Sequence, residues 1–282
     1  MTDRRTDPFR WRFAGDERET SGTGDDRSRS SASRRRGRPT APHVASMTVR
    51  DGLFAHWPVD PDELRPHVPE PLTLETYDGR AWLSVVPFVL ANVGVRGTPP
   101  LTRTAFPELN VRTYVRYRGD PGLFFFSIDL GSPLLAALVG RTTRLPVYYA
   151  RMHASSDEET VSFSSVRRRR YERARSERLD DEGAARFVAT YRPDPDASPS
   201  PAEPDSLAYW LVERRRFYAP EAEGVLAAEI AHDPWPLQPA ELTIRENTLF
   251  EAAGLPSPVG EPVVHYCAEL PMTGSVPRRL SD

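Results

Sequence analysis

The sequence predicts a mainly β domain of the α+β class, built as an antiparallel β-barrel with a few covering helices. Three observations lead to this prediction. The chain has 29 prolines among 282 residues, which favours short strands and turns over long helices. Apolar and polar residues alternate with a period of two in about nine or ten runs. Apolar stripes of helical spacing are few and short.

The chain is expected to divide into a tail and one domain. Residues 1–46 are rich in Arg and Ser and poor in apolar residues, so we expect a disordered tail. Residues 47–282 are expected to form a single barrel domain, with the Pro-rich stretch 193–205 as a surface loop. The sequence leaves open whether translation starts at Met1 or at Met47.

The predicted domain carries an excess of acidic residues. Residues 1–46 hold 11 Arg and 7 acidic residues, so the remainder has 37 − 11 = 26 basic and 40 − 7 = 33 acidic residues, a net charge of −7. This balance disfavours nucleic-acid binding, which needs cationic side chains against phosphates.

The chain contains no apolar run near the ~20 residues of a membrane span, and its start has no signal-peptide core. Cys267 is the single cysteine and lies in an apolar strand pattern, where a packed, inert thiol is expected. We therefore expect a cytoplasmic protein with no membrane partner. A homo-oligomer is compatible with these features.

The stretch 50–88 is interpreted as strand, short helix, turn, strand, tight turn and strand. Asp60 is a suitable N-cap, and Pro61 fits the first helical position. Asp78-Gly79 is the strongest hairpin signal in the chain. On the last strand, Ser84, Val86 and Phe88 are expected to share one face, and Leu83, Val85 and Pro87 the other.

The middle of the chain continues with strands and one helix. A strand is predicted over 108–118, followed by a turn at Asp120-Pro121-Gly122 and a deeply buried strand over 123–130. Ser132-Pro133 is expected to start a helix of buried leucines, with Gly140 as its C-cap. Further strands are expected over 145–152, 161–171 and 184–191.

The last third is expected to alternate helices and strands. Asp205 is expected to cap a helix over 206–217, and Gly254 to end a second helix over 245–253. Strands are expected over 226–232 and 263–270. The charge run Arg167 to Arg170 is either an exposed strand end or a phosphate site.

Standard catalytic motifs are missing. The six histidines show no HxH or HExxH spacing, so no metal site is expected, although distant residues could assemble one. GxSxG, GxGxxG and P-loop patterns do not occur, and no cofactor is expected. The chain contains no lysine, so no side chain can form a Schiff base with a carbonyl substrate.

The candidate site is the polar face of the strand 108–118. Glu108, Asn110 and Arg112 alternate with apolar residues and are followed by an apolar strand, which favours a barrel interior over solvent. An inward arginine needs a partner, because an isolated buried charge costs several kcal/mol. Glu108 could pair with Arg112 and leave donors for an anionic ligand.

The stretch 50–72 resembles the signature of the acetoacetate decarboxylases. The matching residues are Arg50, Trp57, Asp60, Leu64-Arg65 and Val68-Pro69-Glu70-Pro71-Leu72. Six longer segments resemble the YqjF-like family of unknown function in the same superfamily. They are HWPVDPDELRPHVP, DGRAWLSVVPF, PELNVRTYV, LPVYYARM, ERRRFY and HDPWPL. The resemblance covers roughly 47–272 and implies an acetoacetate decarboxylase-like β-barrel with a central pocket.

The resemblance also implies a set of site residues. Arg50 lies where the decarboxylases have a pocket arginine, and Glu108 where they have a catalytic-site glutamate. A second pocket glutamate falls at Ser84, and the adjacent lysine pair falls near Val147-Tyr148. Two positions are kept and the essential amine is lost, so decarboxylation through an imine is not expected.

These observations lead to two functional hypotheses. The first is a barrel that binds a small anionic or carbonyl-bearing metabolite, with Arg50, Ser84, Asn110, Arg112, Tyr148 and Tyr149 as ligand-binding residues. The second is an enzyme that uses lysine-independent acid–base chemistry in the same pocket, with Glu108 as its catalytic residue. The first would show stabilisation by ligand without turnover, and the second would lose turnover in Glu108→Gln.

Overall fold

The computed structural model describes residues 41–282, apart from 158, 172–175, 180–183, 222–223 and 281–282. Residues 1–40 of the predicted tail lie outside the described residues. Residues 43–46, which we assigned to the tail, belong to the first strand. There His43 pairs with Ser275 and Met47 with Met272 of β13, so the pairing of the two strands extends upstream of Met47.

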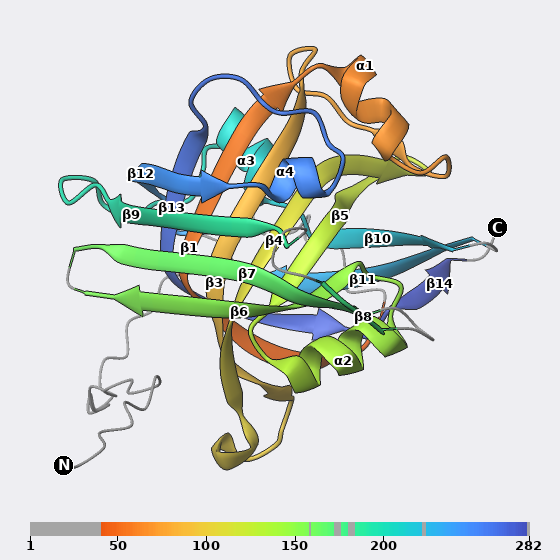
Figure 1. Cartoon of the computed structure of the whole chain (residues 1–282), viewed down its shortest axis with the longest axis vertical. Coiled ribbons are helices and arrows are strands. Elements are labelled where there is room, and N and C mark those ends of the chain that lie inside the picture. Colours follow the sequence, from red (N-terminus) through yellow and green to blue (C-terminus); the bar gives the residue numbers. More distant parts are fainter. Residues whose placement is uncertain (1–40, 158, 172–175, 180–183, 222–223, 281–282) are drawn as a thin grey trace, which may run out of the picture. The chain divides into compact units, whose positions relative to one another are not determined.

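Strands dominate the described part of the chain, and the helices are short (Figure 1). The helices are α1 (Pro61–Leu64), α2 (Pro133–Thr142), α3 (Leu207–Val212) and α4 (Leu249–Ala252), with 3-10 turns at Arg65–His67 and Pro100–Thr102. The strands are β1 (His43–Val59), β2 (Thr73–Leu74), β3 (Ala81–Val95), β4 (Thr104–Tyr117), β5 (Asp120–Leu130), β6 (Val147–Ser156), β7 (Val161–Tyr171), β8 (Ser176–Arg178), β9 (Arg186–Pro193), β10 (Arg216–Glu221), β11 (Gly224–His232), β12 (Gln238–Asn247), β13 (Val263–Ser275) and β14 (Arg278–Leu280).

The strand pairings close on themselves along two paths. One path runs β5-β6-β7-β9-β12-β13-β1-β3-β4 and returns to β5; the other runs β5-β10-β11-β13-β1-β3-β4 and also returns to β5. In Figure 1, β6, β7 and β9 cross in front of the steep strands β1, β3 and β4. β5 pairs in parallel with both β10 and β6, and the other pairings are antiparallel. The predicted fold class, a barrel-like mainly β domain, is confirmed.

The two faces of β1, β3 and β4 enter different hydrophobic clusters. Phe54, Val86 and Phe88 pack with α3 and Trp235. Leu53, Val85 and Leu109 pack with β7, β9 and α4. This division confirms the predicted alternation on β3, because Leu83 and Val85 lie in the second cluster and Val86 and Phe88 in the first.

Local signals in the stretch 50–88 are confirmed. The Asp60 side chain accepts a hydrogen bond from the Asp62 N–H at 2.8 Å and caps α1. Asp78 and Gly79 have φ of 48° and 75°, the paired positive values of a two-residue hairpin turn. Tyr77 and Arg80 exchange both backbone hydrogen bonds across this turn.

One turn and one helix differ from the predictions. The turn between β4 and β5 lies at Arg118-Gly119, with φ of 52° and 86°, so Asp120-Pro121-Gly122 is already in β5. The predicted helix over 206–217 ends at Val212 and its N-cap is Ser206. Residues 213–215 lie outside any helix or strand, and β10 begins at Arg216.

The predicted helix over 245–253 is also wrong in its first half. Residues 238–247 form β12, whose burial alternates with a period of two, and α4 begins only at Leu249. Leu249 and Phe250 pack inward as expected. Pairing of β12 with β9, from Ala240 opposite Pro193 to Asn247 opposite Phe187, outweighs the local helical tendency.

Helix α2 begins as predicted, because the Ser132 hydroxyl accepts from the Leu135 N–H. Its leucines are not the buried contacts we expected: Leu134 is 78% exposed and Leu138 55% exposed. Gly140 is not the C-cap, which is Thr143. Instead, Gly140 lies inside α2 and lets the helix approach β7, since a Cβ there would lie 2.5 Å from Tyr171 Cβ.

We expect Gly140→Ala to destabilise the fold by about 1–3 kcal/mol, because the added methyl meets the Tyr171 backbone and Cβ. The same change would stabilise an unpacked helix by about 1 kcal/mol. Chemical denaturation measures the difference, with Leu138→Ala on the exposed face of α2 as the control. An unchanged or increased stability of Gly140→Ala would contradict the close packing.

The described helices are all too short to cross a membrane: none has both the length and the apolar run that a span requires.

Candidate functional site

The predicted polar face of β4 lies inside the fold. Glu108, Asn110, Arg112 and Tyr114 alternate along the strand on the side of the first hydrophobic cluster, to which Tyr114 belongs. Asn110, Arg112 and Tyr114 are buried, whereas Glu108 is partly buried. The preference for a barrel interior over solvent therefore agrees with the structure for this row.

Three strands bring a hydroxyl, a phenol and an imidazole together on this face. The Ser84 Oγ of β3 lies 2.7 Å from His56 Nδ1 of β1 and 2.7 Å from the Tyr114 hydroxyl of β4. The Tyr114 hydroxyl also lies 3.1 Å from His56 Nδ1. Burial, with help from the positive charge of Arg112, holds the pKa of His56 well below its ordinary value. His56 is therefore a neutral imidazole at physiological pH.

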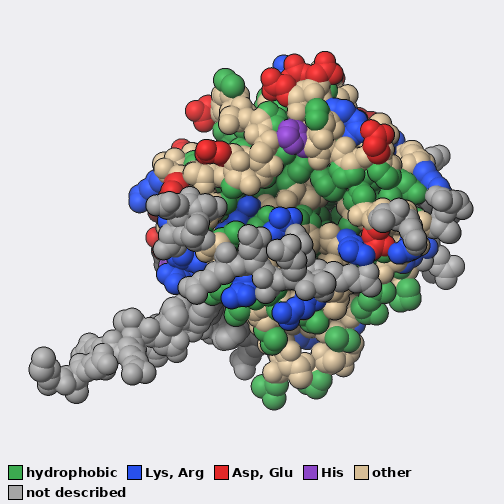
Figure 2. All heavy atoms as spheres, turned by 45° about the vertical axis from the view of Figure 1, so that its right-hand side comes forward, with side chains coloured by type: hydrophobic (Ala, Val, Ile, Leu, Met, Phe, Trp, Pro, Cys, Tyr) green, Lys and Arg blue, Asp and Glu red, His purple; other side chains and the backbone are tan. Residues whose placement is uncertain are grey.

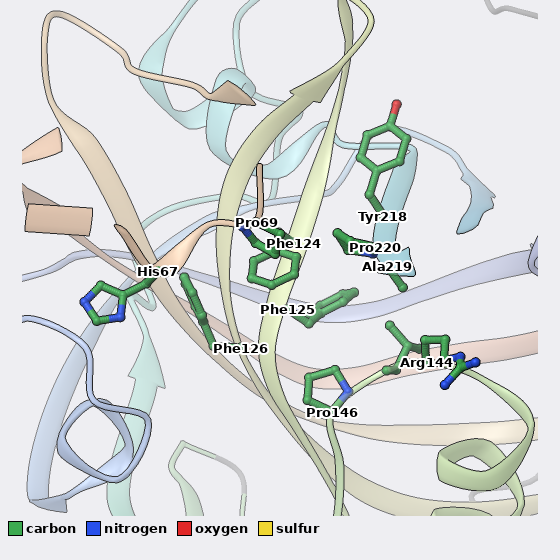
Figure 3. A pocket seen from close by; sticks show the side chains of 11 residues that line it. His67, Pro69, Phe124, Phe125, Phe126, Arg144, Pro146, Tyr218, Ala219 and Pro220 are labelled. Carbon is green, nitrogen blue, oxygen red and sulfur yellow. The ribbon is translucent and has the colours of Figure 1, made fainter. Parts of the chain in front are cut away.

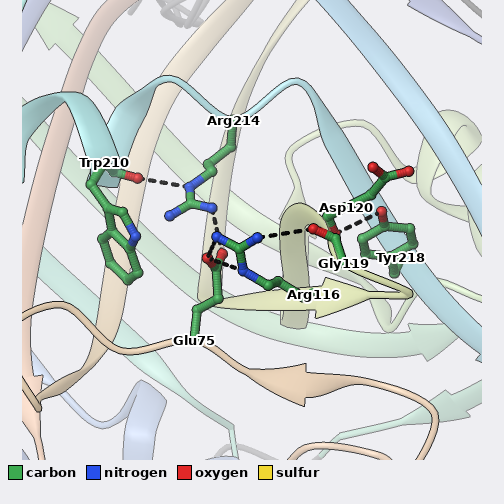
Figure 4. Close-up of polar contacts among 7 residues, drawn as sticks. All are labelled: Glu75, Arg116, Gly119, Asp120, Trp210, Arg214 and Tyr218. Carbon is green, nitrogen blue, oxygen red and sulfur yellow. Dashed lines mark hydrogen bonds and ion pairs between the residues drawn. The ribbon is translucent and has the colours of Figure 1, made fainter. Parts of the chain in front are cut away.

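Three arginines are buried in the described part of the chain, and two have carboxylate partners. Arg167 Nε lies 2.7 Å from Asp129 Oδ1. Arg214 Nη1 lies 2.5 Å from Glu75 Oε2, and Figure 4 shows Glu75 held between Arg214 and Arg116. The third, Arg112, has no carboxylate within 4 Å among the described residues, although it is only 8% exposed.

The contacts of Arg112 are weaker than an ion pair. Its guanidinium lies 5.7 Å from the centre of the Phe54 ring, near the Tyr114 hydroxyl. Its Nε is buried and has no hydrogen-bond partner. Burial lowers the pKa of Arg112, and the neighbouring Tyr114 and Glu108 only partly offset this effect. An arginine nevertheless stays charged in a protein, so its charge needs compensation.

Glu108 is the acidic group on the same row. Burial raises its pKa from 4.5 to about 7, against the opposing effects of a hydrogen bond from Asn110 and the charge of Arg112. The Asn110 amide donates to Glu108 Oε1 at 3.5 Å, and Asn110 Oδ1 is left without a partner. The expected pairing of Glu108 with Arg112 does not form within 4 Å among the described residues.

Other buried polar atoms on this side of the sheet also have no partner among the described residues. They are the Nε2 atoms of His56 and His232, Nδ1 of His265, and the indole nitrogens of Trp82 and Trp235. Buried polar groups in folded proteins nearly always have a partner. His56 and His265 lie with their ring centres 6.3 Å apart, and Phe54 packs edge-on against Trp235 at 4.8 Å. The cluster can therefore accept a polar molecule or ordered water.

The structure separates Arg50 and Tyr148 from the polar face of β4, whereas Tyr149 stays on its side of the sheet. Arg50 lies next to a bulge at Asp51, is 42% exposed and pairs with Glu269 at 3.1 Å, away from Arg112. Tyr148 stacks on Arg167, 4.2 Å from its guanidinium, in the Asp129 network. Tyr149 packs against the first hydrophobic cluster, and the β4–β5–β6 pairings place it in line with Glu108, through Leu130.

Sequence reasoning missed His56, His265 and the role of Tyr114. Tyr114 could have been found, because it lies on the predicted polar face, two residues from Arg112. His56 and His265 carry no spacing signal, since β1 and β13 meet only in the fold, where Phe54 pairs with His265. No group of three or more His, Cys, Asp or Glu in the described part of the chain is arranged to bind a metal.

The structure also tests the predictions about the charge run at Arg167 and about the thiol of Cys267. Arg167 does not reach solvent as an exposed strand end, because it is 2% exposed and bound to Asp129. Cys267 is buried in the first cluster, and burial raises the pKa of its thiol to about 12. The expectation that Cys267 is a packed thiol is confirmed, and its inertness stays a prediction.

Comparison with known proteins gives a family of unknown function. Residues 46–271 match DUF2071, described as an uncharacterized conserved protein. The chain is 43% identical over 225 residues to the uncharacterized protein YqjF of Bacillus subtilis, covering 79% of this chain and 87% of that protein.

Solved structures with the same fold are enzymes of different sequence. The enduracididine biosynthesis enzyme MppR superimposes with a TM-score of 0.58 and 16% identity, covering 86% of this chain and 89% of that one. An acetoacetate decarboxylase structure gives a TM-score of 0.53 and 15% identity over 86% and 91% of the two chains. These similarities show the acetoacetate decarboxylase-like fold predicted from the sequence.

Proposed function

The chain belongs to the DUF2071 family, and from its buried polar face we propose that it binds a small anionic or carbonyl-bearing metabolite beside Arg112. One observation supports this proposal above the others. Of the buried arginines in the described chain, Arg167 and Arg214 have carboxylate partners, but Arg112 has none. An anionic group of a ligand would compensate this charge with one or two charge-assisted hydrogen bonds.

Neighbouring groups suit the rest of such a ligand. The His56 and His265 imidazoles and the Asn110 carboxamide each have a buried atom with no hydrogen-bond partner. A ligand carbonyl or hydroxyl could interact with these atoms. The fold neighbour MppR is described in complex with pyruvate, so small keto acids are the first compounds to test.

The proposed experiment is a thermal-shift screen of the full chain with pyruvate and related acids, followed by calorimetry. We expect Arg112→Met to weaken binding of a hit roughly 10- to 100-fold, because it removes the charged hydrogen-bond donor. Without ligand, the variant should be at least as stable as the wild type, because it removes an uncompensated buried charge.

Arg50→Met is the matched control, since Arg50 is half-buried and, unlike Arg112, is paired with a carboxylate, that of Glu269. It should bind the hit normally. Equal binding by Arg112→Met and the wild type would refute the role of Arg112. Weaker binding by Arg50→Met would show that Arg50 contributes to ligand binding.

The alternative is an enzyme that moves protons without lysine. It is favoured by Glu108, whose pKa of about 7 suits a general acid or base at neutral pH. Proton NMR in D2O would detect exchange at the carbon next to the carbonyl of a bound keto acid. Exchange that is lost in Glu108→Gln, with binding retained, would favour the enzyme; binding without exchange in the wild type would favour the binding protein.

A further inference from the structure

A partly open pocket lies where β5 changes its neighbour. β10 pairs with β5 at Leu123 and Phe124, and β6 pairs with it only from Ile128 onward. The pocket between these two pairings has a volume of about 260 Å³. In Figure 2, which brings this side of the molecule forward, hydrophobic side chains lie in a hollow.

The wall of this pocket is mainly apolar (Figure 3). Its side chains come from β5, β10, the segment before β6 and the turn after α1. Three consecutive phenylalanines, Phe124 to Phe126, form the β5 wall, and all three are only partly buried. The prediction of a deeply buried strand is therefore wrong at these residues. The opposite walls include Pro146 and Pro220.

Phe125 connects this pocket to the buried polar face. It is the cross-strand partner of Arg112 in the β4–β5 pairing and packs against the first hydrophobic cluster. Directly opposed residues share a face, with Cβ atoms about 4.5–5.5 Å apart. Phe126, which the β4–β5 register skips, marks a bulge at this point. The apolar wall therefore adjoins the arginine that has no carboxylate partner.

A second arginine borders the pocket, but its charge is already compensated. Arg144 Nε lies 2.7 Å from Glu221 Oε1, and the Arg144 side chain is 41% exposed. An anionic group in or near the pocket would therefore gain more from Arg112 than from Arg144.

We propose that the ligand is an amphipathic carboxylic acid, whose carboxylate binds Arg112 and whose apolar tail fills the pocket beside Phe125. This inference rests on the proposed function and adds a tail to the ligand. The tail size follows from the volume: 260 Å³ corresponds to about nine groups of ~30 Å³. An acid of about ten carbons, with nine in its tail and the tenth in the carboxylate at Arg112, would fill the pocket.

The test measures binding of straight-chain acids from acetate to dodecanoate to the full chain by calorimetry. Affinity should rise up to about fourfold for each methylene that becomes buried and level off near decanoate. Phe125→Ala should reduce the gain in affinity between acetate and octanoate by at least tenfold, while the affinity for acetate stays unchanged. Arg112→Met should weaken acetate and octanoate by the same factor.

Leu138→Ala, on the exposed face of α2, is the control for loss of an apolar side chain, and melting temperatures without ligand check the fold of each variant. Binding of 1-octanol, which has an apolar tail and no charge, should depend on Phe125 and not on Arg112. This measurement tests the pocket even if one variant is unstable. Arg112-dependent binding of pyruvate or acetate with no gain from a longer tail would overturn this inference and leave the proposed function standing. If no acid binds with dependence on Arg112, the proposed function fails as well.

Discussion

Asp129→Ala is expected to lower the free energy of unfolding by about 3–5 kcal/mol, because it leaves the buried charge of Arg167 uncompensated. Asp129 is 0% exposed and Arg167 2% exposed, with 2.7 Å between Oδ1 and Nε. The Ser165 hydroxyl donates to the other carboxylate oxygen at 3.3 Å, and Arg167 donates to Ser127. This network joins β5 to β7 in the interior, where solvent cannot replace a lost partner.

Chemical denaturation at neutral pH measures this effect. Glu241→Ala is the matched control, because Glu241 pairs with Arg192 at 2.9 Å but is 73% exposed, and its loss should cost less than about 1 kcal/mol. The double variant Asp129→Leu with Arg167→Met should recover much of the loss, since a packed apolar pair replaces both charges. A loss below about 1 kcal/mol for Asp129→Ala would show that Arg167 finds other compensation.

Glu108→Gln is expected to change how stability depends on pH. The pKa of Glu108 is raised to about 7 by burial, whereas the unfolded chain has the ordinary value of 4.5. Between pH 4.5 and pH 7, Glu108 keeps its proton in the folded state but has lost it in the unfolded state. The contribution of Glu108 to the free energy of unfolding is therefore complete below pH 4.5 and is lost as pH rises through 7. The pKa difference of 7 − 4.5 = 2.5 corresponds to at most about 3.5 kcal/mol, at about 1.4 kcal/mol for each pKa unit.

The glutamine variant should therefore match the wild type near pH 4.5 and exceed its stability above pH 7.5. Gln can still accept the hydrogen bond that the Asn110 amide donates to Glu108 Oε1 at 3.5 Å. Denaturation curves of Glu108→Gln and the wild type at several pH values measure the difference. A constant difference between the wild type and Glu108→Gln across this range would mean that Glu108 titrates normally.

Much of the fold could be predicted where a local signal decides the structure. Asp60 caps α1 and Asp78-Gly79 forms a turn because side-chain capping and positive φ depend on few neighbours. Predictions failed where pairing with a distant strand determined the secondary structure. Residues 216–217 and 245–247 carry helical patterns, yet the first pair lies in β10, which pairs with β5 and β11, and the second set lies in β12, which pairs with β9.

The candidate site was predictable only along one strand. Alternation placed Glu108, Asn110 and Arg112 on one buried row, but it could not show that Arg50 turns away to Glu269. The histidines of the cluster come from β1 and β13, which are far apart in the sequence and adjacent in the sheet. Such neighbours leave no spacing pattern to read.

By itself, the sequence determined a lysine-free β domain with one polar strand face, because composition and alternation are properties of the chain alone. The tertiary structure decided which buried arginine stays without an acid. Asp129 reaches Arg167 from another strand, and Glu75 reaches Arg214 across 139 positions of sequence, while no described carboxylate comes within 4 Å of Arg112. The physical reason is that charge compensation depends on distances in space, which the packing of distant strands sets.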